Sequence, residues 1–111
     1  MPGAILAIWG ASAHEVYFAG SDAGDGTGPM LLHFDGDRWR RVETGLTQGD
    51  LWWPLGFASG ELFVVGSRGV VLRYDRATLH PQTMATPDST STLYGVWGPT
   101  PQDLWAVGHR L

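Results

Sequence analysis

The feature that most constrains this chain is a segment that occurs three times. Each copy contains two apolar runs that end in glycine, and the two glycines lie ten residues apart in every copy. The second glycines, which are 46 and then 42 residues apart, are Gly20, Gly66 and Gly108. A repeat of about 42 residues predicts an array of similar supersecondary units, because such a unit buries its apolar face only against its neighbours.

The repeat divides the chain into two full units and a partial one. The 111 residues suit a single domain, 1–111. Repeat 1 covers 5–50, repeat 2 covers 51–92 and a partial repeat 3 covers 93–111. The downstream run 31–35 of repeat 1 matches 71–75 of repeat 2, and repeat 3 stops before this run begins.

Each full repeat contains four short runs rich in aromatic and β-branched residues. Clusters of Gly, Pro, Asp and Ser separate these runs, and helical periodicity is absent. The 16 glycines and 7 prolines also favour many turns between short elements. We therefore predict an all-β fold of ten strands, with antiparallel four-stranded units. Four strands in about 42 residues is the size of one β-propeller blade.

The repeated residues resemble a family of bacterial β-propeller repeats. Its pattern is L-x-x-V-W-G, then D-V/L-W/Y-A-V-G, then I-L-H-Y-D-G-x-x-W, which matches 93–98, 103–108 and 31–39. A more distant similarity links the chain to the Asp-box (BNR) propellers, although here Asp35 and Gly36 are adjacent and Trp39 comes four residues after the acid. The resemblance implies propeller blades within large secreted or surface proteins of bacteria.

Composition excludes several classes of function. The net charge is -4 and all seven basic residues are arginine, which disfavours nucleic acid as a partner. The absence of cysteine excludes disulfides, a thiolate zinc site and a cysteine nucleophile. No apolar run is long enough for a membrane span. The segment 4–13 imitates a short signal peptide, but one copy of the repeat explains it better.

Several repeated positions are expected to have structural roles. Trp9 and Trp97 occupy one repeat position, and Tyr17, Phe63 and Trp105 occupy another, so these rings are expected to pack between blades. The repeated acids are Glu15, Glu61 and Asp103. Because every repeat has one, we expect them to accept hydrogen bonds from backbone amides at the entry to the second strand.

The ligand-binding candidates are three aromatic residues. Trp52 and Trp53 are adjacent, so on a strand they point to opposite faces and one can be exposed. Tyr94 occupies the repeat position of Trp52. Such rings could stack on a sugar.

The loop 21–29 is the only feature without a counterpart in the other repeats. Its acids Asp22 and Asp25 are weak candidates for a calcium site, but the loop lacks the alternating acids and distal glutamate of an EF-hand. A flexible hairpin loop is the favoured interpretation. The histidines have no metal-ligand spacing, so no metal or other cofactor is expected.

Two function classes follow. The favoured one is a non-enzymatic propeller module that binds a glycan or a protein or serves as a spacer. The alternative is a fragment of a sialidase-like glycoside hydrolase, which needs an arginine cluster and a Tyr/Glu pair. The available residues lie too close to repeat positions to fill those roles; they are Arg68, Arg73, Tyr74 and Glu61.

The number of repeats predicts what the chain contacts. Two and a half blades cannot close a ring of four to eight, so strand edges and blade faces stay exposed. We expect self-association through these edges or faces, or further blades of a parent chain. The family resemblance suggests an extracellular or cell-envelope location.

Overall fold

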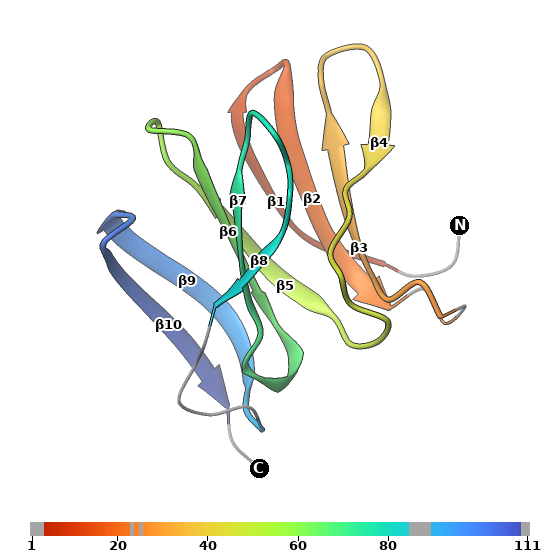
Figure 1. Ribbon diagram of the computed structural model, residues 1–111, viewed down its shortest axis with the longest axis vertical. Helices are drawn as coiled ribbons and strands as arrows, with labels where there is room; N and C mark the ends of the chain where they lie inside the picture. The colour runs from red at the N-terminus through yellow and green to blue at the C-terminus, as the bar shows by residue number, and fades with distance from the viewer. Residues whose placement is uncertain (1–3, 23, 25, 85–89, 110–111) are drawn as a thin grey trace.

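The computed structural model is an all-β protein made of three antiparallel sheets (Figure 1). It describes residues 4–22, 24, 26–84 and 90–109. Within these residues the sheets have four, four and two strands, which confirms the expected ten strands and the four-stranded antiparallel units. In every sheet, neighbouring strands are also consecutive in the chain. No helix in the described part is long and apolar enough to cross a membrane.

Each sheet corresponds to one copy of the repeat. Sheet 1 contains β1 (Ile5–Ser12), β2 (Glu15–Asp22), β3 (Pro29–Phe34) and β4 (Trp39–Arg41). Sheet 2 contains β5 (Leu51–Gly56), β6 (Glu61–Gly66), β7 (Val71–Asp75) and β8 (Gln82–Met84), with the short 3-10 turn η1 (Ser67–Gly69) between β6 and β7. Sheet 3 contains β9 (Thr92–Thr100) and β10 (Asp103–His109).

The alternation of side chains along the strands gives every sheet two faces. We name the side that carries Trp9 and Tyr17 in sheet 1 the forward face. The opposite side, which carries Ile8 and Phe18, is the rear face. The same cross-strand register places equivalent pairs on the other forward faces; they are Leu55 with Phe63 in sheet 2 and Trp97 with Trp105 in sheet 3.

The main core lies between the forward face of sheet 1 and the rear face of sheet 2. Its fully buried members come from both sheets and are Tyr17, Ala19, Leu31, Leu51, Leu62, Val64, Leu72 and Tyr74. Sheet 3 covers the forward face of sheet 2 in the same way, so that Phe63, Val65 and Val96 are buried. The three sheets therefore form a stack in chain order (Figure 1).

The second repeated glycine is explained by close backbone approach. A Cβ atom at Gly20, Gly66 or Gly108 would collide with the carbonyl oxygen of the residue at the start of the neighbouring first strand. Each first strand also has a register shift beside this glycine, which leaves one residue without a cross-strand partner. These extra residues are Leu6, Trp52 and Tyr94.

Candidate functional site

The forward face of sheet 3 is a wide exposed apolar surface. Trp97, Trp105 and Val107 are 65%, 67% and 65% exposed. The equivalents of Trp105 in sheets 1 and 2, Tyr17 and Phe63, are almost completely buried. The expectation that Trp97 and Trp105 pack between sheets is therefore wrong within the described chain, because no described segment covers this face.

The exposed tryptophans belong to an open hollow of about 530 Å³. The hollow is lined by aromatic residues, valines and one glycine. The lining residues are Trp53, Tyr94, Gly95, Val96, Trp97, Trp105 and Val107. Two of the three ligand-binding candidates thus lie in one hollow. The third, Trp52, packs edge-on against Tyr94 with ring centroids 5.1 Å apart. The structure brings all three candidates together.

The local backbone explains how the three rings meet. Trp52 and Tyr94 are the extra residues of their strands, and their rings meet between sheets 2 and 3. Trp53 is the more exposed member of its pair, at 46%, whereas Trp52 is half-buried. The sequence expectation that one of the two would be exposed agrees with this arrangement.

The chemistry of the hollow is almost entirely apolar. Among its lining residues the side-chain polar groups are the Tyr94 hydroxyl and the indole N–H groups, and no lining residue is charged or carries an amide side chain. A small polar ligand is normally oriented by several convergent polar groups. A contiguous exposed apolar patch of this kind is more typical of a protein–protein contact.

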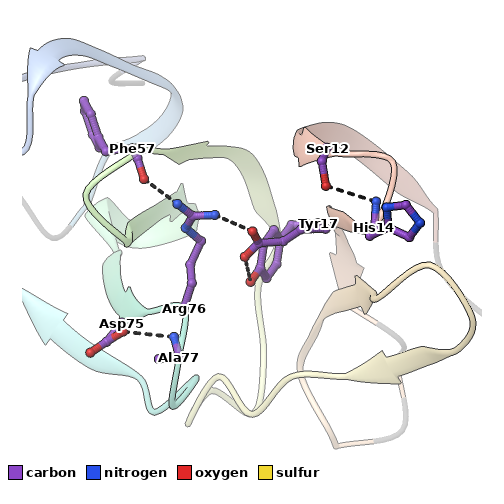
Figure 2. Close-up of polar contacts among 8 residues, drawn as sticks. Ser12, His14, Tyr17, Phe57, Asp75, Arg76 and Ala77 are labelled. Carbon is purple, nitrogen blue, oxygen red and sulfur yellow. Dashed lines mark hydrogen bonds and ion pairs between the residues drawn. The ribbon is translucent and has the colours of Figure 1, made fainter.

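A second cluster joins sheets 1 and 2 (Figure 2). The Arg76 guanidinium donates from Nη1 to Glu15 Oε1 at 2.6 Å and from Nη2 to the Phe57 carbonyl oxygen at 2.5 Å. It also lies over the Trp9 ring, 5.1 Å from the centroid. The Tyr17 hydroxyl donates to the other oxygen of Glu15 at 3.1 Å. Arg76 follows β7 and Glu15 begins β2, so the cluster links the two sheets.

This cluster places a Tyr/Glu pair beside one arginine, whereas a sialidase-like reaction requires such a pair and a cluster of arginines. Tyr17, however, has no exposed surface. Burial, reinforced by the neighbouring Glu15 carboxylate, raises the pKa of the Tyr17 hydroxyl far above its usual value. A buried hydroxyl with a raised pKa is a poor nucleophile, so the geometry favours a structural link.

The repeated acids have different contacts in the three sheets. Glu15 accepts hydrogen bonds from two side chains, whereas the sequence predicted backbone amide donors for it. The Ser59 hydroxyl donates to Glu61 at 2.5 Å, and this bond is the main cause that lowers the pKa of the Glu61 carboxyl. Asp103 is exposed at the start of β10. One repeat position therefore has no single role.

The carboxylate of Asp22 binds backbone amides of the surrounding loops. Its two oxygens accept hydrogen bonds from the N–H groups of Gly24, at 2.8 Å, and of Gly49, at 3.0 Å. Asp25, the other calcium candidate, lies outside the described residues. Among the residues that the structure describes, no three His, Asp or Glu side chains form a group that could hold a metal ion.

His33 is a buried polar residue to which the sequence assigned no role. It is 9% exposed and its ring stacks on Tyr17 with centroids 4.6 Å apart. Neither ring nitrogen has a hydrogen-bond partner. Burial, together with the nearby Arg40, lowers the pKa of His33. No sequence signal could have identified this site, because repeat 2 has the exposed Arg73 at the equivalent position.

The chain was also compared with known proteins. No family model matches it, and no match was found among the curated proteins or the solved structures.

Proposed function

We propose that the chain is a non-enzymatic repeat module of β-propeller type that acts as a scaffold and binds protein through the forward face of sheet 3. The resemblance to bacterial propeller repeats supports this proposal and favours an extracellular or cell-envelope location. The four-stranded antiparallel form of sheets 1 and 2 is compatible with propeller blades.

One observation carries the proposal. The forward faces of sheets 1 and 2 are each covered by the rear face of the following sheet, and the forward face of sheet 3 has the same pattern without a cover among the described residues. Complete burial of a tryptophan ring contributes up to about 4–6 kcal/mol, from about 150–250 Å² at about 25 cal/mol/Å². Trp97 and Trp105 are 65% and 67% exposed, so a cover gains about two thirds of this for each ring, and that gain offsets the cost of association.

The lining of the hollow favours a protein partner over a glycan. Aromatic faces can stack on sugar rings, but Trp53 and Tyr94 are not accompanied by charged or amide side chains that could bind sugar hydroxyls. An apolar protein surface needs no such groups.

A glycan array, followed by fluorescence titration of any hit, tests this choice. We expect no glycan to bind in a manner that depends on the hollow. Trp53→Ala changes the hollow, and Met84→Ala, at an exposed apolar residue of β8 outside the hollow, is the control. A glycan that binds the natural chain and Met84→Ala but not Trp53→Ala would show that the ligand of the hollow is a carbohydrate and not a protein.

The alternative function is a fragment of a sialidase-like hydrolase, and its motivating observation is the Tyr17 and Glu15 pair beside Arg76. The test is hydrolysis of an artificial sialoside by the purified chain. We expect no hydrolysis, because Tyr17 is buried. Turnover that Tyr17→Phe abolishes would establish the enzyme and exclude the scaffold role.

A further inference from the structure

We infer that the partner of the forward face of sheet 3 is the rear face of sheet 1 in a second copy of this chain, docked head to tail. The inference rests on the proposed function and gives its protein partner an identity. It follows from the way in which the chain already joins its own sheets.

The chain carries both halves of such a contact. The rear face of sheet 1 exposes Ile8 and Trp39, at 60% and 53%. Trp39 packs on Phe18 and Phe34, with ring centroids 4.5 and 4.8 Å apart. In sheet 2 the rear face is buried against sheet 1 through Pro54, Val64, Leu72 and Tyr74, and Leu79, at the repeat position of Trp39, is partly buried against the same core. Among the described residues, the forward face of sheet 3 therefore has no rear face packed on it, and the rear face of sheet 1 has no forward face packed on it.

The strands that the contact needs are also present. Between sheets 1 and 2, the strands β1 and β2 contact β5; between sheets 2 and 3, β5 and β6 contact β9. Most of the close approach is thus between the first two strands of one sheet and the first strand of the next, with smaller contributions from β3 and η1. Sheet 3 has its first two strands, and β1 of a second copy supplies the receiving strand. The two-stranded sheet 3 therefore supplies the strands that make most of this contact.

The contact between sheets 1 and 2 indicates which residue pair anchors the contact between two copies. The Trp9 ring lies where a Cβ atom of Gly56 would be, so only glycine permits this approach. Trp97 has the repeat position of Trp9, and Gly10 has that of Gly56. Gly10 is exposed, and an added Cβ would make only ordinary contacts, at 3.5 Å or more, within its own chain. Trp97 of one copy therefore packs against Gly10 of the next.

The geometry of the contact determines the kind of assembly. Different faces meet, so the contact is heterologous and generates a ring when the rotation closes, or an open filament when it does not. A two-fold dimer, in which the same face meets itself, is not compatible with this inference.

Two variants that each block one face test the inference. Ile8→Arg blocks the rear face of sheet 1, and Trp105→Arg blocks the forward face of sheet 3. Both residues are more than half exposed, so each variant can keep its fold as a monomer. The mass of each sample is measured by light scattering over a tenfold concentration range, and a thermal melt confirms that each variant is folded.

The expected results are specific to head-to-tail docking. The natural chain forms a closed ring or a filament of two or more copies, each variant alone stays at the monomer mass of 12.1 kDa, and a 1:1 mixture forms one dimer. The mixture dimerises because Ile8→Arg retains its forward face and Trp105→Arg retains its rear face. Thr47→Arg, at an exposed site in the connection between β4 and β5, is the control and keeps the mass of the natural chain.

Other outcomes overturn the inference. Dimers of Ile8→Arg alone would show that forward faces pair with each other. A natural chain that is folded but monomeric at every concentration would exclude a second copy as the partner. That result would leave the proposed scaffold function standing, since only the glycan and hydrolysis tests decide it.

The anchor has its own test. Gly10→Ala adds one methyl group where Trp97 is expected to pack, and should weaken the assembly about tenfold or more. The melt of the monomeric Ile8→Arg chain should be unchanged by the same substitution. An unchanged assembly would show that Trp97 does not pack against Gly10.

Discussion

The contact between sheets 1 and 2 and the forward face of sheet 3 are built from the same repeat positions, yet they have opposite environments. Tyr17 has no exposed surface, whereas Trp105, at the equivalent position, is 67% exposed. Trp9 packs on Gly56 and Arg76, whereas the equivalent Trp97 is 65% exposed. The comparison teaches that a repeated sequence specifies which residues can form a contact, while the presence of the next sheet decides whether they are buried.

The largest difference between the two regions should appear when the paired rings are removed. Tyr17→Ala deletes a ring from the packed core and should lower the free energy of unfolding by about 3–5 kcal/mol. Trp105→Ala, made in the monomeric Ile8→Arg background, should change it by no more than about 0.5 kcal/mol. Urea unfolding measures both effects. Equal losses at the two positions would mean that Trp105 is buried in the monomer and would refute the comparison.

The paired glycines sharpen the same contrast. Gly56→Ala should destabilise the fold by about 1–3 kcal/mol, because its methyl group overlaps the Trp9 ring. Gly10→Ala in the Ile8→Arg background should be neutral to within about 0.5 kcal/mol, because nothing covers that position in a monomer. Thermal unfolding compares the two. A neutral Gly56→Ala would contradict the close approach of Trp9.

The link between sheets 1 and 2 should make a smaller contribution. A double-mutant cycle of Glu15→Gln and Arg76→Met should give a coupling energy of about 1–2 kcal/mol. The Glu15 side chain is 30% exposed, which limits the gain through solvent screening. Glu15→Gln combined with Arg38→Met is the control, since Arg38 is largely exposed and its ion pair is with Asp37. A coupling energy near zero would mean that the ion pair does not stabilise the contact.

The smallest expected effect is a pH dependence of stability that comes from the contact between sheets 1 and 2. Burial favours neutral His33, so its pKa in the folded chain lies below the ordinary value of 6.5. The unfolded chain then binds the proton first, and stability falls as the pH decreases from about 7 to 5. His33→Phe should remove this slope, and His14→Gln, at an exposed histidine, should retain it. A slope that persists in His33→Phe would assign the titration to another group. Melting temperatures across this range provide the measurement.

The sequence predicted the strands well because its repeat contains local information. The alternation of apolar residues and the glycines at 20, 66 and 108 mark the second strand of each sheet. The observed sheets of four, four and two strands agree with that pattern. The cluster of Trp52, Trp53 and Tyr94 could also be proposed, since adjacent aromatic residues on a strand seldom both lie in the core.

The contacts between sheets could not be predicted in the same way. Arg76 lies 61 residues from Glu15, and repeat 1 has Gly36 where repeat 2 has Arg76, so no repeated pattern indicated the ion pair. The repeat also predicted burial for Trp97 and Trp105, and both are exposed. The prediction failed because equivalence of position carries no information on whether another sheet covers the face.

The most direct test of the account is the solution mass of the natural chain from low to tenfold higher concentration. The account predicts a folded assembly of two or more copies, with a mass that is a multiple of 12.1 kDa and a cooperative melt. A mass of 12.1 kDa at every concentration, with the same cooperative melt, would contradict the claim that the two exposed faces of the stack are made for each other.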